Sequence, residues 1–238
     1  MWPAPREEGK RKRVRGMGTL IITVVYGGLE IEETPLVDSL RRVGYGGEFQ
    51  VVREEGDIGN RRRMFSYARA LRQAGPGIDR VILTDARDVL FQGDPGEIRH
   101  GELDLFLEAE GQTLGSCPIN QRNYIDEYGE AAFEAVKDRP ISCAGVVIGT
   151  RAGVERYLDL FCAEVERCRP HVPWSQPLHN RLLWSGALDP VRVIPNEQGA
   201  VYTVGHCPEL RVREHLVLNR AGRVPYIVHQ FDRHLAIL

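Results

Sequence analysis

The sequence lacks any apolar run close to the roughly 18 residues that a membrane-spanning helix requires, which argues against an integral membrane protein. It also lacks a charge excess: 31 Lys and Arg oppose 33 Asp and Glu, for a net charge of −2. This balance gives no global electrostatic reason to bind nucleic acid. The five cysteines include no Cys-x-x-Cys pair, so zinc-ribbon and thioredoxin-like sites are excluded by spacing. We expect reduced, mostly buried thiols and a cytoplasmic location.

The 238 residues suffice for one domain, and 42% of them are apolar, enough for a full core. The 25 glycines and 14 prolines favour a loop-rich globular enzyme or binding domain over a helical bundle. Residues 1–17 are polar and basic and do not form a secretory signal. We expect them to be a disordered leader, whose basic run at 10–15 is either solvated or contacts an acidic partner. A single domain is then expected over 18–238.

The first half of the chain alternates between strand and helix patterns. Unalternating apolar runs are typical of buried parallel strands, and apolar residues spaced by three or four positions indicate helices. The resulting order is strand, helix, strand, helix, strand at 19–27, 34–44, 48–54, 60–75 and 79–85. This order predicts an α/β fold with a mixed, mostly parallel central sheet flanked by helices.

The second half is less regular but carries no sign of a repeat or a linker. Strands are expected at 104–110 and 141–150, and again within 191–195, 200–204 and 223–231. Helices are expected at 123–138, 151–168 and 176–186. The whole chain beyond the leader is therefore predicted to form one continuous α/β domain.

The most informative segment is the acidic turn after the third strand, where Asp85 and Asp88 follow an apolar run. In open α/β sheets, ligands bind beyond the carboxyl ends of the strands. Two carboxylates there need a compensating cation or hydrogen-bond donor, and oxygen ligands suit Mg²⁺ or Mn²⁺. The alternative is that Asp85 caps the next turn and Asp88 pairs with Arg87 or another base.

Four motifs in order resemble a group of GT-A-fold glycosyltransferases, which use nucleotide-sugar donors. They are Asp-x-Arg-Asp followed by an apolar pair, Phe-Gln and Asp-Pro; Cys-small-Gly-Val-x-x-Gly; a Gln-x-x-x-Asn helix start; and a closing His-Gln-aromatic-Asp-Arg. In this chain they begin at Asp85, Cys143, Gln176 and His229. The resemblance covers most of the chain from about Thr19 and implies a GT-A-like (Rossmann-like) domain.

The resemblance implies a divalent ion, Mn²⁺ or Mg²⁺, held by Asp85, Asp88 and His229. Such an ion would stabilise the charge that develops on a nucleoside diphosphate leaving group, which gives Asp88 a catalytic role as well. The two aspartates are one residue further apart than in Asp-x-Asp, so one of them can instead bind ribose or the sugar. Without the resemblance, His229 would be interpreted as an edge histidine with a backbone partner.

Several further residues are candidates for binding the donor phosphates, base or ribose. A guanidinium from Arg62, Arg63 or Arg87 can bind phosphate oxygens in a bidentate manner, although consecutive arginines usually form a solvated face. Tyr26 and Gly27 follow the first strand, where this fold meets the nucleobase and ribose. A plain tight turn explains the glycine equally well.

The donor sugar is expected near Ala144 and Gly145, whose small side chains leave room, unless they mark a tightly packed strand crossing. Gln176, His179 and Asn180 begin a helix and are expected to bind sugar hydroxyls, with Gln176 near the acceptor. Position 175 is serine where the related motif usually has aspartate, so the general base stays unassigned. Glu108 and Glu110 are substitute carboxylates, with Glu108 as the catalytic candidate.

The leading hypothesis is transfer of a hexosyl or related sugar from a UDP- or GDP-linked donor to an acceptor hydroxyl on a glycan or small molecule. One alternative, raised by Ser175, is a noncatalytic nucleotide-sugar-binding domain. A second is a nucleotidyltransferase, which normally carries a glycine-rich basic loop after its first strand. Here the segment at 26–33 is acidic instead.

Overall fold

The structure, a computed structural model, describes residues 18–56, 59–168 and 174–234. The predicted leader at 1–17 lies outside the described residues. A six-stranded sheet forms the centre, in the order β2-β1-β3-β6-β5-β7. Its strands are Glu48–Arg53, Gly18–Val25, Ile78–Thr84, Ser142–Thr150, Leu103–Leu107 and Arg192–Ile194, in that order.

The pairing of the strands confirms the predicted mixed, mostly parallel sheet. β1 runs parallel to β2 and β3, and β5 runs parallel to β7. Only β6 runs against its two neighbours, β3 and β5. Because β6 is reversed, its first residues lie at the edge where β1, β3 and β5 end.

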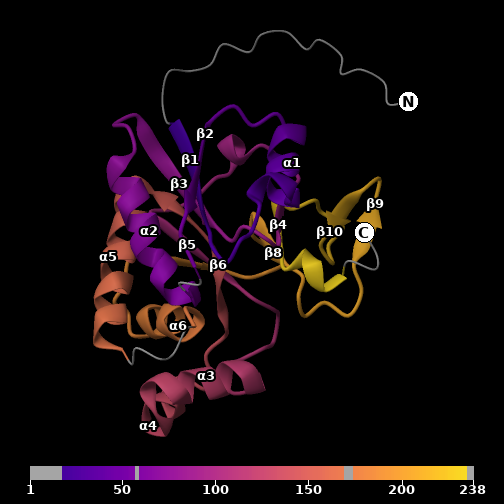
Figure 1. The fold of residues 1–238 in the computed structure, drawn as a ribbon. Coiled ribbons are helices and arrows are strands. Elements are labelled where there is room, and N and C mark those ends of the chain that lie inside the picture. Colours follow the sequence, from indigo (N-terminus) through magenta and orange to yellow (C-terminus); the bar gives the residue numbers. More distant parts are fainter. Residues whose placement is uncertain (1–17, 57–58, 169–173, 235–238) are drawn as a thin grey trace.

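Both faces of the sheet are covered, as Figure 1 shows. Helices α2 (Gly59–Gln73), α5 (Arg151–Arg167) and α6 (Gln176–Trp184) cover one face, and α1 (Pro35–Arg42) lies on the other. Alternate residues of β1 enter different cores: Leu20 packs toward α2 and α5, and Ile21 packs toward α1. Burial on both faces explains why β1 reads as an unbroken apolar run.

A second, three-stranded sheet with the order β4-β11-β8 lies beside α1. It contains β4 (Val89–Phe91), β11 (Ile227–His229) and β8 (Val201–Thr203), with β11 antiparallel to β4 and parallel to β8. A hairpin of β9 (Arg211–Arg213) and β10 (Leu216–Leu218) follows β8. The sequence predicted strands around β8 and β11, but it predicted neither β4 nor the hairpin.

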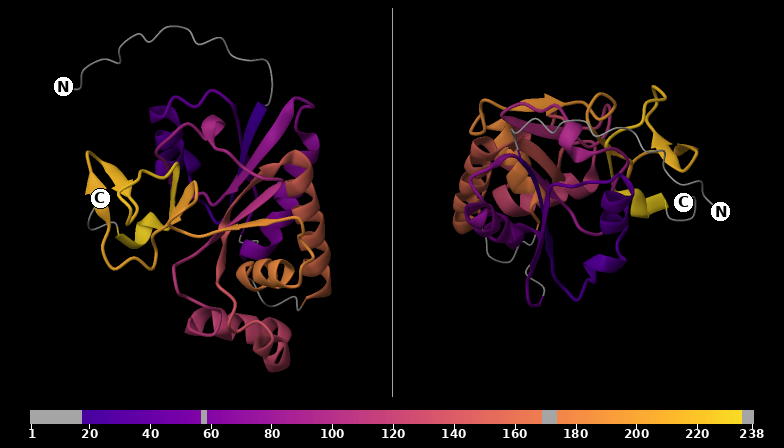
Figure 2. Two further views of the ribbon diagram at one scale, coloured as in Figure 1. Left: turned by 180° about the vertical axis from the view of Figure 1, so that it is seen from behind. Right: turned by 90° about the horizontal axis from the view of Figure 1, so that it is seen from above.

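The predicted helix at 123–138 is wrong in its bounds and continuity. The chain forms α3 (Pro118–Tyr128) and then a separate short α4 (Glu130–Glu134). Gly129 separates them with φ +82°, a conformation that glycine adopts without strain and that ends a helix. Figures 1 and 2 show this helical pair projecting beyond the rest of the fold. The predicted strand at 104–110 also ends early, at Leu107.

Within the described ranges, no helix is both long enough and apolar enough to cross a membrane.

Candidate metal centre

Three parts of the central sheet bring site residues to one edge. Asp85 follows β3, Glu108 follows β5, and Gly145 lies in the first half of β6. The backbone N–H of Asp85 donates to the carbonyl oxygen of Gly145 at 2.9 Å, which locks the acidic turn to β6. The site therefore forms where the rule for α/β sheets expects it, beyond the carboxyl ends of the parallel strands.

His229 reaches this edge through the second sheet. β11 pairs with β4 so that His229 lies opposite Val89, the residue after Asp88. The backbone N–H of Gln230 then donates to the carbonyl oxygen of Asp88 at 2.8 Å. Pairing between two short strands far apart in sequence thus places the imidazole beside the acidic turn.

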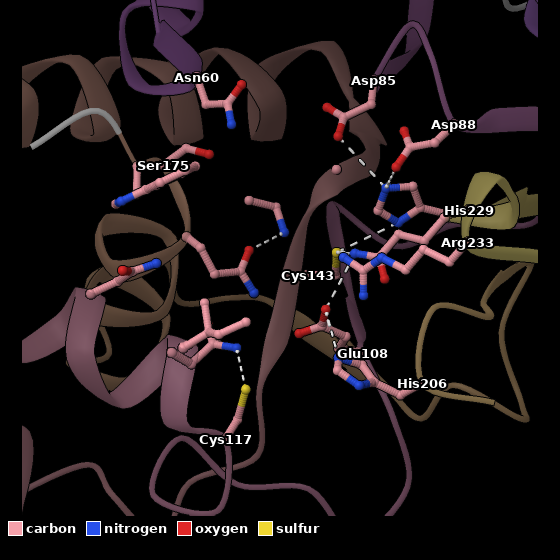
Figure 3. Close-up of a pocket in the computed structure, with 18 of the residues that line it drawn as sticks. Asn60, Asp85, Asp88, Glu108, Cys117, Cys143, Ser175, His206, His229 and Arg233 are labelled. Atoms are coloured by element: carbon pink, nitrogen blue, oxygen red, sulfur yellow. Dashed lines mark hydrogen bonds and ion pairs between the residues drawn. The ribbon is translucent and has the colours of Figure 1, made fainter. Parts of the chain in front are cut away.

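Asp85, Asp88 and His229 form a compact cluster, shown in Figure 3. His229 Nε2 lies 3.6 Å from Asp85 Oδ2 and 3.6 Å from Asp88 Oδ2, and one ligand atom from each residue lies within 4.8 Å of the others. These separations are too long for hydrogen bonds. Ligand atoms about 2.1 Å from a shared ion lie about 3 Å apart when adjacent and about 4 Å apart when opposite, and the two 3.6 Å separations fall within this range.

The donor set and its burial support the same interpretation. The His229 side chain is only 2% exposed, and its Nε2 has no hydrogen-bond partner among the described residues. An unpaired buried nitrogen is costly unless a ligand satisfies it. On the other side of the ring, Nδ1 lies 3.5 Å from Cys143 Sγ. That contact holds the ring with Nε2 toward the carboxylates.

Gly145 leaves the room that this cluster needs. A Cβ atom at this position would lie 2.3 Å from His229 Cε1, 2.4 Å from its Nε2 and 3.0 Å from Asp85 Oδ2. Any larger residue would therefore push the imidazole away from the carboxylates. The sequence analysis expected Gly145 near the donor sugar, and in the structure it lies against His229 and Asp85.

Arg63 sets the charge of the cluster from the side of α2. Its side chain is 7% exposed, and its guanidinium forms an ion pair with Asp85 Oδ1. Burial alone would raise the pKa of Asp85, but Arg63 and His229 outweigh burial and hold this pKa below its usual value. Burial raises the pKa of Asp88, and the neighbouring Asp85 adds to that effect. The two carboxylates thus have unequal proton affinities.

The imidazole responds to the same neighbours. Burial acts to lower the pKa of His229, but contacts with Cys143, Asp85 and Asp88 raise it well above its ordinary value. Positive charge is therefore favoured at the centre of this cluster, whether a proton or a metal ion carries it.

The cluster opens into a cavity of about 470 Å³. Eight of the predicted site residues line it: Arg63, Asp85, Asp88, Glu108, Ala144, Gly145, Gln176 and His229. Several other lining residues were not predicted from the sequence: Asn60, Asn123, Trp174, His206, Gln230 and Arg233. Gln230 and Arg233 belong to the closing motif that begins at His229, which was the signal available for them.

The structure places two of the predicted sugar ligands away from the cavity. His179 and Asn180 are fully buried and do not line the cavity. His179 Nε2 lies 2.9 Å from Ser142 Oγ and Nδ1 lies 2.9 Å from Tyr157 OH, while the Asn180 amide bonds both backbone groups of Ser142. These side chains fasten α6 to the start of β6 and are not free to bind a sugar.

Gln176 does line the cavity, but its amide is also committed to β6. Its Oε1 accepts from the backbone N–H of Ala144 at 2.9 Å, and its Nε2 donates to the carbonyl oxygen of Ser142 at 2.9 Å. Gln176 therefore fixes the position of Ala144 on the cavity wall. Ser175, where the related motif carries aspartate, is 5% exposed and lines the cavity beside it.

The remaining predicted residues lie outside the cavity lining. Arg62 and Arg87 are exposed and Gly27 forms an exposed turn with φ +64°. The Tyr26 hydroxyl donates to Asn60 Oδ1, and Asn60 lines the cavity. Glu110, the alternative to Glu108, is exposed and lies outside the lining as well.

No protein-family model matches this chain, and no curated protein matches it at a significant level.

Proposed function

We propose that this protein is a metal-dependent glycosyltransferase that transfers a sugar from a nucleoside diphosphate donor to an acceptor hydroxyl. The observation that carries the proposal is the convergence of Asp85, Asp88 and His229, with an unpaired buried Nε2, on a cavity at the carboxyl edge of an α/β sheet. A hard divalent ion, Mn²⁺ or Mg²⁺, suits two carboxylates and one imidazole. Bound there, it would supply positive charge to the leaving diphosphate.

Two arginines contribute to binding of the metal and the diphosphate in this proposal. Arg63 holds Asp85 in place and keeps it ionised, so that it can serve as a ligand at neutral pH. Arg233 lines the same cavity, and its guanidinium has no ion-pair partner among the described residues. A guanidinium free of carboxylates is well suited to bind phosphate oxygens, so we assign Arg233 to the diphosphate.

The direct test is thermal unfolding with ligands. We expect UDP or GDP together with Mn²⁺ to raise the melting temperature by about 5 °C at saturating concentrations, and either alone to have little effect. Asp88→Asn should abolish the shift because the amide carries no charge for the ion. Arg87→Gln, in the same turn but exposed and outside the cavity, is the matched control and should keep it.

The alternatives give different results in the same experiments. Absence of a shift with any nucleoside diphosphate and metal would overturn the donor site. Binding without hydrolysis of any donor sugar would indicate the noncatalytic nucleotide-sugar-binding domain. Release of pyrophosphate from a nucleoside triphosphate and a sugar phosphate would indicate a nucleotidyltransferase.

A further inference from the structure

A buried carboxylate outside the metal cluster stands on the wall of the same cavity. Glu108 follows β5, is 5% exposed, and lines the cavity on the side where Figure 3 shows His206 and Arg233. Its ligand atoms are not part of the cluster formed by Asp85, Asp88 and His229. Glu108 therefore stands apart from the three residues proposed to hold the ion.

Only one oxygen of the Glu108 carboxylate has a hydrogen-bond partner among the described residues. Oε1 accepts a hydrogen bond from Gln230 Nε2 at 3.2 Å and lies 3.5 Å from His206 Nε2. Oε2 is buried and has no hydrogen-bond partner among the described residues. An unpaired buried carboxylate oxygen is destabilising, and a catalytic role is one of the established reasons for such a group in a native protein.

The residue that holds Glu108 is itself strained. Gln230 has φ +61°, a left-handed conformation that is uncommon for residues other than glycine. In this conformation its backbone N–H bonds the carbonyl oxygen of Asp88 while its side chain bonds Glu108. Gln230 thereby fixes Glu108 relative to the acidic turn. Strain of this kind is typical of positions that pre-organise a site.

We propose that Glu108 is the general base that accepts the proton of the acceptor hydroxyl, with Gln230 as its positioning residue. This inference rests on the proposed glycosyltransferase function. It fills the role left open by Ser175, because Glu108 lines the cavity and its Oε2 has no hydrogen-bond partner among the described residues. Burial would raise the pKa of Glu108, but His206 and Gln230 lower it below its usual value, so the base is ionised at neutral pH.

The proposed step balances as a single displacement. The acceptor oxygen forms a bond to the anomeric carbon, and its proton passes to the Glu108 carboxylate. The bond from that carbon to the diphosphate oxygen breaks, and its electron pair stays on the diphosphate. One displacement inverts the anomeric configuration, which is a second consequence of the assignment.

The experiment uses water as the acceptor, so the natural acceptor need not be known. Release of UDP or GDP from a panel of UDP- and GDP-linked hexoses is measured with Mn²⁺ for the wild type, Glu108→Gln, Glu108→Asp and the control Glu110→Gln. We expect Glu108→Gln to lower the hydrolysis rate by about 100-fold or more, the range of general-base effects. Glu108→Asp should retain part of the rate, and Glu110→Gln all of it, because Glu110 lies outside the cavity.

Thermal shifts with UDP or GDP and Mn²⁺ separate the two proposals. If the wild type shows no shift, the proposed function fails. If the wild type shows a shift and Glu108→Gln hydrolyses the donor within threefold of its rate, the base assignment fails and the donor site stands. Loss of the shift in Glu108→Gln would place Glu108 in the donor site, which overturns the base assignment. Retention of the anomeric configuration would exclude the single inverting displacement and overturns the assignment as well. The base assignment also fails if the wild type shows the thermal shift but hydrolyses none of the donors.

Discussion

Two buried histidines, both proposed from the sequence as site residues, occupy opposite kinds of surroundings. His179, in α6, has both ring nitrogens 2.9 Å from hydroxyl groups and lies away from the cavity. His229, at the end of β11, has an unpaired Nε2 facing two carboxylates. The difference shows that burial alone does not identify a ligand. The deciding observation is whether each nitrogen already has a partner.

The surroundings also shift the pKa values of the two imidazoles in opposite directions. Burial without any charged partner lowers the pKa of His179 to about 3, so this ring is neutral in the folded protein. The pKa of His229 is raised because its negative neighbours outweigh burial. The structural His179 and the proposed ligand His229 therefore differ in charge as well as in hydrogen bonding.

The largest expected effect is on stability, through His179. Replacing His179 with Ala leaves a cavity and removes one partner each from the buried hydroxyls of Ser142 and Tyr157. We expect the free energy of unfolding to fall by about 3–5 kcal/mol, measured by urea denaturation. The Mn²⁺ affinity of the folded variant should stay within about threefold of the wild type.

For His229→Ala we expect the main effect on metal binding, in contrast to His179→Ala. It should weaken Mn²⁺ binding by more than about 100-fold, measured by titration calorimetry on the folded variant. If His179→Ala weakened Mn²⁺ binding as much as His229→Ala did, the distinction between the two histidines would not hold.

The sequence could anticipate much of the fold but only part of this distinction. The expected strands and helices of the first half agree with β1, α1, β2, α2 and β3 to within a few residues, because unbroken apolar runs and three-to-four spacing are local signals. The short β4 and the hairpin carry no such signal. Their three-residue strands are defined by partners elsewhere in the chain.

The site divides in the same way. The position of Asp85 at the end of a strand could be predicted locally, whereas the approach of His229 depends on the pairing of β11 with β4 and was expected only from the family resemblance. The burial of His179, by contrast, is indicated by the sequence itself. Gln176, His179, Asn180 and Leu183 share one helical face by their spacing, which favours packing over ligand binding.

An intermediate effect on Mn²⁺ affinity is expected at Gly145, which leaves space for the two carboxylates and His229. In Gly145→Ala, the added methyl group would overlap the imidazole of His229, so the ring must move away from Asp85. We expect Mn²⁺ affinity to fall by at least about tenfold. Ala144→Ser changes a neighbouring cavity-wall residue without entering the cluster and is the matched control. Unchanged affinity in Gly145→Ala would show that Asp85 and His229 do not bind one ion.

The smallest expected effect is the pH dependence that His179 contributes to stability. Its pKa is about 3 in the folded protein and near the ordinary value of about 6.5 when unfolded. Below pH 6.5 the unfolded chain therefore binds a proton that the folded protein excludes, so stability falls as the pH falls, and the loss continues toward pH 3. Between pH 6 and pH 5 this amounts to about 1 kcal/mol. Urea unfolding of the wild type and His179→Gln at both values measures it, because the glutamine variant should lose about 1 kcal/mol less; equal losses would mean that His179 is protonated inside the fold.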